Sequence, residues 1–409
     1  MHDLLPEDEA LWRHVRDTAE RVARLFDYRM VQTPIVEDAS VFLRTVGDES
    51  DIVSKEMYVF EDRGGDRLAL RPEGTAAVCR AYIEHGMASR PQPVRLFYFG
   101  PMFRYDRPQA GRYRQLTQFG VECIGDASPA ADVEVIELQR TLYEQLGLGA
   151  LTLRINSIGT AETRHRYIEA LTAHFQPHVA TFSRDSHRRF ETNVLRILDS
   201  KEDAGHPAVQ QAPSILDYLD EGDAQHFAEV RAFLDATGVA YEVDPRIVRG
   251  LDYYARTVWE FEPAGAGGQS TVGAGGRYDG LIELLGGPPT PGTGMATGIE
   301  RIMLNLKERG IEAASNREPL LYIAPLGEAF SAALGVARSV RAERVAVRVG
   351  QPGRSLRAHF RAAESAGAAY IAIVGDNEVA GGVVQLKALS GDAEQREVPT
   401  AEVAAAILG

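Results

Sequence analysis

The densest group of side chains that could do chemistry lies between residues 100 and 122. Four arginines fall within eleven residues, around a Pro/Gly turn that separates two β-type runs. This arrangement predicts a β-hairpin in which alternate side chains share a face, so that Arg104, Gln118 and Glu122 point the same way. Guanidinium groups form bidentate, charge-assisted hydrogen bonds with phosphate oxygens. The cluster therefore favours a nucleotide site over a solvated hairpin with surface arginines.

Two further segments carry polar groups that suit an amino acid ligand. In residues 71–75, the carboxylate of Glu73 and a hydroxyl two residues later could grip a cationic amine, although the local pattern alone favours a turn or helix cap for Glu73. In residues 248–257, Arg249 and the pair Tyr253–Tyr254 lie between two β-type runs. A tyrosine hydroxyl can bond one imidazole nitrogen and an ionised glutamate the other. Tyrosines buried in a core are the alternative interpretation of this pair.

A fourth segment, residues 292–301, combines several glycines with Arg301. Its spacing superficially matches a dinucleotide-binding loop, but no strand–helix–strand unit with a downstream acid surrounds it. A glycine-rich strand that leads into a helix with Arg301 in its first turn predicts a different type of ATP site.

Hydrophobic periodicity predicts the elements that must position these segments. Pro34, in the extended run 28–36, places that run at a sheet edge, an end or an interface. Residues 160–238 lose strand alternation and predict a mainly helical insertion. Helical spacing marks residues 7–26, 132–146 and 298–309, and β-type runs mark 57–60, 68–71, 94–99, 115–124, 151–155, 241–243 and 257–261.

The pattern changes after a polar linker at residues 312–319. Strands then alternate with helices, which predicts a small α/β domain with its own sheet. Seven arginines and a single acid occur between residues 338 and 361, and Arg354, Arg357 and Arg361 have the spacing of one helical face. Such a stripe suits nucleic-acid phosphates, with a solvated helix face as the alternative. The expected strands cover 320–324, 344–349, 370–374 and 383–386, and the expected helices 330–340 and 355–366.

Length and composition limit the class of protein. The 409 residues suffice for two or three domains, and the net charge of -14 argues against a protein that coats nucleic acid through bulk charge. No apolar run approaches the roughly 18 residues of a membrane helix, and the start lacks a secretory signal. The two cysteines, Cys79 and Cys123, are too few for a zinc knuckle or a disulfide framework. We therefore expect a reducing cytoplasm and no membrane.

Taken in order, these segments resemble the class II aminoacyl-tRNA synthetases, and specifically the histidyl-tRNA synthetase family. Thr33-Pro34 is similar to motif 1, the arginine-rich hairpin to motif 2, and residues 298–301 to motif 3. The blocks at 249–254 and 275–281 are similar to blocks particular to this family, and the resemblance covers nearly the whole chain. It implies an α+β fold: an antiparallel-sheet catalytic domain with a helical insertion at 1–317, and an anticodon-binding domain at 318–409.

The resemblance implies ATP-dependent ligation of L-histidine to tRNA(His) through a histidyl-adenylate. Glu73 and Thr75 are expected to hold the α-amino group, and Glu122 and Tyr254 to read the imidazole. Gln118 is expected near the amino group, and Tyr253 along the pocket wall. The complete expected histidine site consists of Glu73, Thr75, Arg104, Gln118, Glu122, Arg249, Tyr253 and Tyr254.

The expected catalytic residues are arginines. The resemblance implies that Arg104 and Arg301 clamp the ATP phosphates and that Arg112 also binds ATP. It assigns Arg249 to the histidine carboxylate and the α-phosphate, so that Arg249 and Arg104 are the expected catalytic residues. Fixed guanidinium groups would stabilise the charge that develops on phosphate oxygens during in-line attack. Mg2+ is expected with the β- and γ-phosphates, with no dedicated protein ligands for a metal.

The implied partners are tRNA(His) and a second copy of the chain. Arg107 and Gln109 match positions in the motif 2 loop that approach the tRNA acceptor end, and motif 1 lies at the homodimer interface in this class. The sequence departs from the family pattern at Val194, where proline is usual, and at Ala255, where asparagine is commoner. It also begins almost at Asp3, without the family's short lead, which could weaken activity or stability.

Two alternatives belong to other functional classes. A catalytically inactive paralogue, the histidine-sensing regulatory subunit of ATP phosphoribosyltransferase, would be expected to lose the motif 2 arginines and parts of the tRNA-binding apparatus. Here Arg104, Arg112, Arg249 and Arg301 are all present. A synthetase-like scaffold for RNA or signalling would be expected to carry appended domains or an altered pocket, and the sequence suggests neither.

Overall fold

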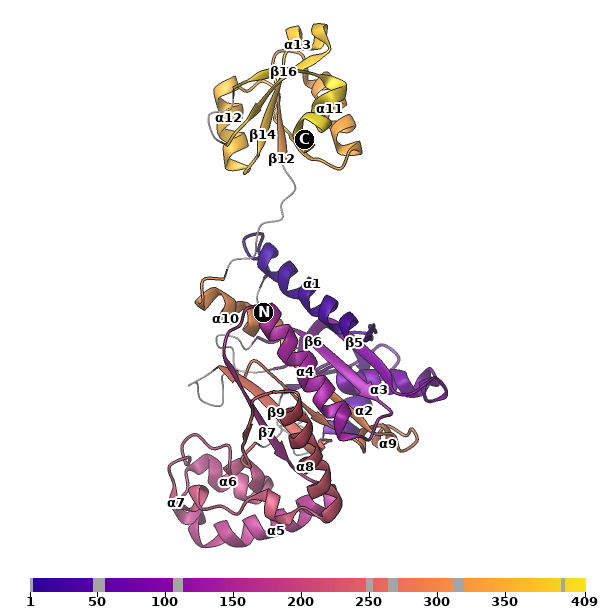
Figure 1. Ribbon diagram of the computed structural model, residues 1–409, viewed down its shortest axis with the longest axis vertical. Coiled ribbons are helices and arrows are strands. Elements are labelled where there is room, and N and C mark those ends of the chain that lie inside the picture. The colour runs from indigo at the N-terminus through magenta and orange to yellow at the C-terminus, as the bar shows by residue number, and fades with distance from the viewer. Residues whose placement is uncertain are drawn as a thin grey trace. The chain divides into compact units, whose positions relative to one another are not determined.

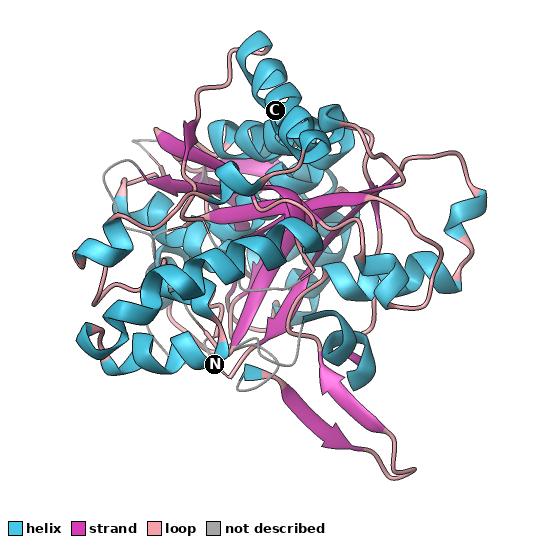
Figure 2. Cartoon of the chain, turned by 90° about the horizontal axis from the view of Figure 1, so that it is seen from below, coloured by secondary structure: helices cyan, strands magenta, loops and turns pink. Residues whose placement is uncertain are grey.

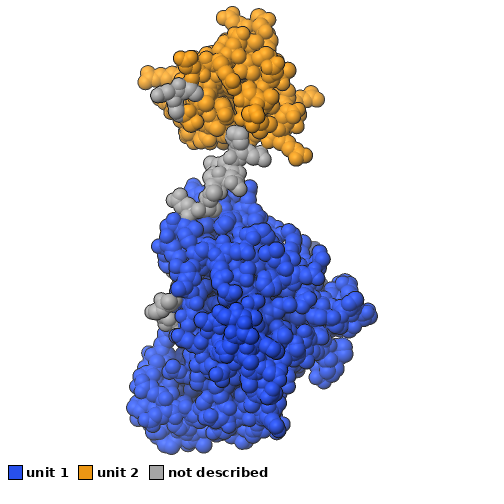
Figure 3. Space-filling model, in the orientation of Figure 1, with its two compact units in different colours: residues 1–313 blue, residues 314–409 orange. Residues whose placement is uncertain are grey.

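The computed structural model divides the chain into two compact units, Met1–Ala313 and Ala314–Gly409 (Figures 1 and 3). Each unit has its own sheet and its own hydrophobic core. The boundary expected after residue 317 lies outside the described residues, so it stays a prediction. The structure describes residues 3–46, 56–105, 113–247, 253–263, 271–311, 320–390 and 394–409.

The first unit is built on an eight-stranded sheet in the order β1-β5-β6-β11-β10-β9-β7-β8. From β5 to β7 each neighbouring pair is antiparallel, whereas the outer pairs β1–β5 and β7–β8 are parallel. The predicted antiparallel sheet is therefore confirmed. The strands are β1 (Arg29–Met30), β5 (Val94–Phe103), β6 (Gln115–Ile124), β7 (Leu151–Ser157), β8 (Glu242–Val243), β9 (Ala255–Pro263), β10 (Gly273–Arg277) and β11 (Gly292–Gly298).

Alternate residues of β6 face two different cores. Phe119, Val121 and Cys123 pack against helices on what we call the apolar face of the sheet. Gln118 and Glu122 point to the opposite side, which we call the polar face. Helices lie on both sides of the strands (Figure 2). The apolar face is covered by α1 (Glu9–Leu25), α4 (Pro129–Gln145), α8 (Glu221–Ala236) and α10 (Ile299–Glu308), and the polar face by α3 (Thr75–Glu84) and α9 (Leu281–Leu284).

Helices α1 and α3 differ in how clearly their hydrophobic periodicity predicts a helix. The buried residues Leu11, Val15, Ala19 and Val22 of α1 follow helical spacing along one stripe, so its pattern is plain. Each large aliphatic side chain buried in this way contributes about 1.5–3 kcal/mol to stability. In α3, seven of ten residues are buried, so no polar face marks the period. The sequence analysis therefore did not detect α3.

A small sheet with the order β2-β4-β3 carries the segment around Pro34. Pro34 lies between β1, the terminal strand of the large sheet, and β2, which confirms the predicted edge position. The buried side chain of Arg71 holds this segment, because its Nη1 donates to the carbonyl oxygen of Thr33 at 2.7 Å and its Nε to that of Pro101 at 2.9 Å. The elements here are β2 (Val36–Asp38), α2 (Ala39–Val46), β3 (Tyr58–Glu61), β4 (Arg67–Leu70) and a 3-10 turn at Met87–Ser89.

The inserted region between β7 and β8 is mainly helical, as the loss of strand alternation in residues 160–238 predicted. Its first part has a separate core that includes Tyr167, Leu171, Phe175 and Ile197. Helix α8 instead packs with α4 in the core of the large sheet, and Figure 1 shows it running from the inserted helices toward β9. The other elements are α5 (Ala161–Phe175), α6 (Arg184–Thr192), α7 (Pro207–Gln210) and 3-10 turns at Gln176–Thr181, Val194–Ile197 and Ile215–Tyr218.

The second unit is a five-stranded sheet in the order β13-β12-β14-β15-β16. Strands β13, β12 and β14 are parallel, and β15 and β16 add an antiparallel edge. Helices α11 and α14 pack on one face of the sheet and α12 on the other, which confirms the expected α/β domain. The elements are β12 (Leu320–Pro325), α11 (Phe330–Ala342), β13 (Ala346–Val349), α12 (Leu356–Ser365), β14 (Tyr370–Val374), α13 (Asp376–Gly381), β15 (Val383–Ala388), β16 (Arg396–Pro399), a 3-10 turn at Thr400–Glu402 and α14 (Val403–Leu408).

The expected arginine stripe on α12 is wrong at one position. Ser355 is the N-cap of α12, and its side chain accepts the N–H of Ala358. Arg354 therefore precedes the helix, and only Arg357 and Arg361 of the predicted set lie on it. A serine followed by helical spacing is an N-cap signal, and it identifies the start of this helix correctly.

Candidate active site

The β5–β6 hairpin places two predicted residues on the polar face of the large sheet. Its register pairs Gly100 with Gln118 and Leu96 with Glu122. Since both residues of β6 have even numbers, they point to the same side, four residues apart. Both are buried, with Glu122 completely inaccessible. The hairpin thus presents an amide and a carboxyl group inside the protein, where each needs polar partners.

Arg104 lies just after the end of β5, near the turn of this hairpin. Its Nε donates to the carbonyl oxygen of Pro72 at 2.8 Å, and its backbone N–H donates to Arg114 at 2.8 Å. These bonds tie the hairpin to the segment that leads into α3. Three further predicted residues from the turn lie outside the described residues: Arg107, Gln109 and Arg112.

Glu73 caps α3 and faces the site at the same time. Its carboxylate accepts the backbone N–H groups of Thr75 at 2.6 Å and Ala76 at 2.9 Å, which satisfies two of the helix's free donors. The helix-capping interpretation of Glu73 is therefore confirmed. Burial raises the pKa of Glu73, and the two backbone bonds partly oppose this effect. A buried carboxylate at this place could still receive a cationic amine.

Glu122 is the centre of the polar face. Its Oε1 accepts the hydroxyl of Thr75 at 2.7 Å, and its Oε2 accepts the hydroxyl of Tyr278 at 2.6 Å. Burial raises the pKa of Glu122 from 4.5 to about 8, although both hydroxyl bonds lower it. The sequence interpretation required an ionised glutamate. In the free protein at pH 7 the protonated form predominates, because the cost of burying the charge exceeds the gain from two hydroxyl donors.

The predicted tyrosine pair belongs to the same buried cluster as Tyr278. Tyr253 and Tyr254 are both buried, with ring centroids 4.8 Å apart, and the ring of Tyr253 lies 6.1 Å from that of Tyr278. The backbone carbonyl of Tyr254 accepts a hydrogen bond from Nη2 of Arg164 on α5 at 2.9 Å. Burial raises the pKa of the Tyr253 hydroxyl well above 10, so it stays a donor. Arg249, a few residues earlier, lies outside the described residues.

Two site residues were missed by the sequence analysis. Tyr278 holds Glu122 as described, and its only sequence signal was its place in the block 275–281. The hydroxyl of Tyr98 and Oε1 of Gln118 are buried and have no hydrogen-bond partner among the residues that the structure describes. Buried polar atoms are normally paired, so these two are available to a bound ligand. Period-two alternation along β5, in register with Gln118, was the available signal for Tyr98.

Two glycines make room for these groups. A Cβ at Gly120 would lie 2.3 Å from the ring of Tyr98, and a Cβ at Gly294 would lie 2.0 Å from Oε2 of Glu122. Gly294 pairs with Glu122 across β6 and β11, so the carboxyl group lies over it. The glycine-rich strands of the sequence therefore provide the volume that the polar side chains occupy.

Arg301 lies in the first turn of α10, as predicted, directly after β11. Its Nη1 donates to the carbonyl oxygen of Thr271, and the neighbouring Glu300 accepts the backbone N–H of Thr117 at 2.8 Å. Thr117 belongs to the end of β6 near the hairpin turn, where Arg104 also lies. The two arginines are thus at the opposite end of β6 from Glu122, roughly 15 Å along the strand at about 3.3 Å per residue.

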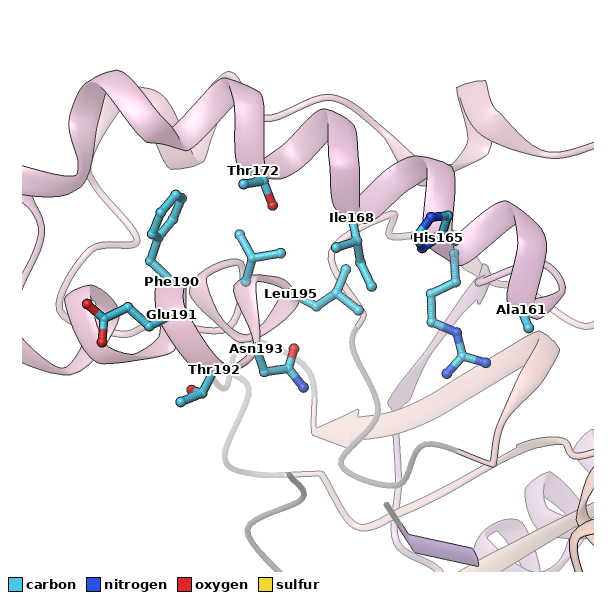
Figure 4. Close-up of a pocket in the computed structure, with 11 residues that line it drawn as sticks. Ala161, His165, Ile168, Thr172, Phe190, Glu191, Thr192, Asn193 and Leu195 are labelled. Carbon is cyan, nitrogen blue, oxygen red and sulfur yellow. The ribbon is translucent and has the colours of Figure 1, made fainter. Parts of the chain in front are cut away.

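A hollow lined by the tyrosine pair adjoins a second hollow in the insertion. The first, of about 660 Å3, is lined by Tyr253, Tyr254, Arg164 and Arg256 among others. The second, of about 630 Å3, lies in the insertion (Figure 4). There α5 presents His165, Ile168 and Thr172 along one side, and residues 190–195 line the other. Both hollows include Ala161 and Arg164, so they adjoin at the start of α5.

Within the described ranges, no three His, Cys, Asp or Glu side chains come together in a way that could hold a metal ion. None of the helices in the described part of the chain is both long and apolar enough to span a membrane.

Comparisons with known proteins extend along nearly the whole chain. The sequence model of the family described as "Histidyl-tRNA synthetase" matches residues 1–302, and that described as "Anticodon binding domain" matches residues 321–409. The Histidine–tRNA ligase of Dehalococcoides mccartyi is 47% identical over 398 residues, which cover 97% of this chain and 95% of that protein. That of Anoxybacillus flavithermus is 46% identical over 400 residues, with coverages of 97% and 94%. A crystal structure of apo S. aureus histidyl-tRNA synthetase superposes with a TM-score of 0.81 at 35% identity, covering 100% of this chain and 98% of that chain.

Proposed function

The chain belongs to the histidyl-tRNA synthetase family, and on that premise we propose how its residues divide the reaction between them. It is a histidine–tRNA ligase, which joins L-histidine to tRNA(His) with ATP through a histidyl-adenylate and releases AMP and pyrophosphate. The proposal concerns the roles of single residues, the metal, the assembly and the location.

The observation that carries the histidine site is the buried Glu122 between two hydroxyl donors and beside the tyrosine pair. Burial raises the pKa of Glu122, and an imidazolium ring that enters the pocket opposes this effect, because a cation beside the carboxyl group favours its ionised form. An imidazolium–carboxylate pair then forms inside the protein, and the Tyr254 hydroxyl bonds the other ring nitrogen, with Tyr253 along the wall. A hydrophobic isostere of histidine would leave Glu122 with no such partner, and this difference gives the site its specificity.

The amino acid backbone is held at the start of α3. Glu73 and Thr75 bind the α-amino group, with Gln118 nearby, because Glu73 keeps its carboxylate beside that helix terminus. The free Oε1 of Gln118 supplies a further acceptor, so far as the described residues show. Arg249 binds the carboxylate together with Arg104, which leaves the carboxylate oxygen directed toward the hairpin turn.

ATP lies toward the hairpin turn, where the arginines gather. Arg104 and Arg301 clamp its phosphates, and Arg112 binds it from the turn. The carboxylate of histidine attacks the α-phosphorus in line, the bond to the bridging oxygen breaks, and pyrophosphate leaves. Arg249 and Arg104 stabilise the negative charge on the phosphate oxygens, and Arg104 is held for this role by its bond to the carbonyl oxygen of Pro72. ATP enters as its magnesium complex, with Mg2+ on the β- and γ-phosphates, so the ion is part of the substrate.

Transfer to tRNA uses no side-chain nucleophile. The terminal ribose hydroxyl attacks the adenylate carbonyl, and AMP leaves with the electron pair of the broken bond. Arg107 and Gln109 approach the acceptor end from the motif 2 turn, and the second unit binds the anticodon. Arg357 and Arg361 on α12 are exposed, which supports a contact with phosphates there.

The protein acts as a homodimer in the cytoplasm. The segment around Pro34 forms the subunit interface, and it is lined by exposed apolar side chains that a partner copy would cover. These are Met30, Ile35, Val36, Val59 and Phe60. Sedimentation velocity of the purified chain tests this assembly, and a species of monomer mass at micromolar concentration would contradict it.

ATP–pyrophosphate exchange with each of the twenty amino acids tests the function directly. Exchange with histidine alone is the expected result, since only histidine carries an imidazole that can pair with Glu122 and Tyr254 together. Measurable histidine binding with no exchange would favour the alternative, a histidine-sensing regulatory subunit of ATP phosphoribosyltransferase. Charging of tRNA(His) but not of another tRNA then tests the second step.

A further inference from the structure

Strand β9 contains a bulge directly after the tyrosine pair. Its register with β10 shifts so that Arg256 and Thr257 have no residue opposite them in that strand. Arg256 has a φ of 53°, a left-handed backbone conformation that is costly for a residue with a Cβ. Bulges beside binding sites commonly redirect a side chain. We therefore expect the side chain of Arg256 to make an interaction that offsets the cost of this backbone conformation.

The redirected side chain reaches a buried carboxylate at the start of α8. Nε of Arg256 lies 2.9 Å from Oδ1 of Asp223, whose side chain is fully buried. Oδ2 of Asp223 accepts the backbone N–H of Thr160 at 2.8 Å and the hydroxyl of Thr163 at 3.3 Å. Asp223 thus joins three elements: the tyrosine-bearing end of β9, the start of α5 and the start of α8. Nη1 of Arg256 also lies 3.7 Å from Oδ2 of Asp279.

A second bond from the insertion holds the same segment two residues earlier. Nη2 of Arg164 on α5 donates to the carbonyl oxygen of Tyr254 at 2.9 Å. Between these two attachments lies the hollow of about 660 Å3, lined by both arginines and both tyrosines. The backbone next to Tyr253 and Tyr254 is therefore held on this side by groups on the inserted helices, in addition to the backbone hydrogen bonds of Arg256 with Ile158 and Gly159.

We propose that Arg256 and Asp223 are positioning residues for histidine recognition, through which helices α5 and α8 hold Tyr253 and Tyr254 against the Glu122 pocket. This inference rests on the proposed function. Neither residue touches the amino acid; each acts through the backbone of the tyrosine pair. Hydrogen-bond recognition requires the donor to stay within about 0.5 Å of its best position, so a loosened segment weakens binding.

Helix α8 has a second anchor, which is connected to Arg256 through Asp279: Oδ2 of Asp279 lies 3.7 Å from Nη1 of Arg256, and Oδ1 lies 3.1 Å from Nη1 of Arg277. Nε2 of His226, one turn along α8, lies 2.8 Å from Oδ2 of Asp132, and Asp132 is paired with the buried Arg277 at 2.9 Å. Apolar residues of α8 such as Val230 and Leu234 also lie in the core of the sheet. Loss of the Asp223–Arg256 pair should therefore leave α8 in place and change the tyrosine segment.

Steady-state ATP–pyrophosphate exchange with Asp223→Asn and Arg256→Gln tests the proposal. We expect KM for histidine to rise at least about 10-fold in each variant, with KM for ATP within twofold, because Arg104 and Arg301, which clamp the ATP phosphates, lie at the other end of β6. Asparagine still accepts the N–H of Thr160, so the start of α5 keeps that bond. KM for histidine in the double variant should not exceed that of the more impaired single variant, since both substitutions remove the same pair.

Arg256→Gly keeps the test valid if the glutamine variant folds poorly. Glycine adopts a left-handed φ without strain, so it removes the ion pair and relieves the backbone cost together. We expect thermal stability equal to the wild type and the same rise in KM for histidine. Arg166→Gln is the matched control, because Arg166 lies on α5 but its Nη2 bonds the carbonyl oxygen of Tyr218 within the insertion.

The results of these assays distinguish a failure of the positioning role from a failure of the proposed function. An unchanged KM for histidine in folded Arg256→Gly, or equal rises in both KM values, overturns the positioning role. A wild-type chain that binds histidine by calorimetry but gives no exchange contradicts the proposed function, and histidine affinity in the variants then tests the positioning role. A wild-type chain that does neither overturns both.

Discussion

The two faces of strand β6 are made from alternate residues of one ten-residue strand, yet they follow different rules. Phe119, Val121 and Cys123 on the apolar face fill the space under α1 and α4 and are completely buried. On the polar face Gln118, Gly120 and Glu122 are also buried, but glycine leaves volume and the polar groups occupy it. The sheet thus places a stable apolar core within a few ångströms of a polar site whose burial lowers the stability of the fold.

The difference shows that the polar face, which carries the candidate site, lowers the stability of the fold. Among the described residues, no cation compensates the buried carboxyl group of Glu122, and its pKa of about 8 reflects the cost of burying its charge. The apolar face supplies the burial that offsets it. Substitutions on the polar face should therefore change recognition and pH dependence, whereas those on the apolar face should change stability alone.

The largest effect is expected from Glu122→Gln. The folded pKa of Glu122 is about 8 against 4.5 in the unfolded chain, so the contribution of this group to wild-type stability falls as pH rises from 4.5 to 8 and then levels off. Glutamine has no such dependence. The free energy of unfolding of the variant should rise relative to the wild type by on the order of 4 kcal/mol between pH 5 and 8, at about 1.36 kcal/mol per unit.

Denaturant titrations at pH 5, 6, 7 and 8 measure this difference. Tryptophan fluorescence reports the first unit alone, because the two tryptophans, Trp12 and Trp259, both belong to it. A constant difference between the two proteins over this range would mean that Glu122 titrates normally. The same variant should bind histidine weakly, since an amide has no negative charge to pair with an imidazolium ring.

Gly294→Ala should have the next largest effect. The added Cβ would lie 2.0 Å from Oε2 of Glu122 and 2.6 Å from the backbone oxygen of Val121, so the carboxyl group must move. A shift of about 1 Å costs roughly 100-fold in rate at a positioned site, and overpacking costs about 1–3 kcal/mol in stability. Histidine-dependent pyrophosphate exchange and thermal unfolding measure these two losses.

Met295→Leu is the control for Gly294→Ala on the same strand. Met295 is buried in the core of the apolar face, and leucine conserves its volume. Exchange activity should stay within twofold of the wild type. Equal loss of activity in both variants would mean that β11 does not separate the two faces.

The smallest effect on function is expected from Val121→Ala, next to Glu122 but on the opposite face. Val121 is completely buried, and removal of two carbons should cost about 2 kcal/mol in the free energy of unfolding. KM for histidine should not change, because the polar face keeps its contacts. A clear rise in KM for histidine at a temperature well below unfolding would show that the faces are coupled.

Much of the architecture was predictable because its physical signals are local. Alternation in residues 94–124 predicted the hairpin and placed Gln118 and Glu122 on one face, as the register shows. Helical spacing predicted α1, α4 and α10, and the change of pattern after residue 312 predicted the α/β unit. Helix α3 was not predicted, because burial on nearly all sides removes the polar stripe. Arg354 was misplaced because the N-cap at Ser355 decides where a helical face begins.

By itself, the sequence determined the family and the kinds of group available: arginines for phosphate, carboxylates and tyrosines for an amino acid, and glycines beside them. Only the tertiary structure decided how those groups interact. Thr75, Glu122 and Tyr278 are distant in sequence, and their hydrogen bonds exist because three separate elements meet on the polar face. The pKa of Glu122 and the link between Arg256 and Asp223 follow from burial and from a strand bulge, and both depend on contacts that no local pattern contains.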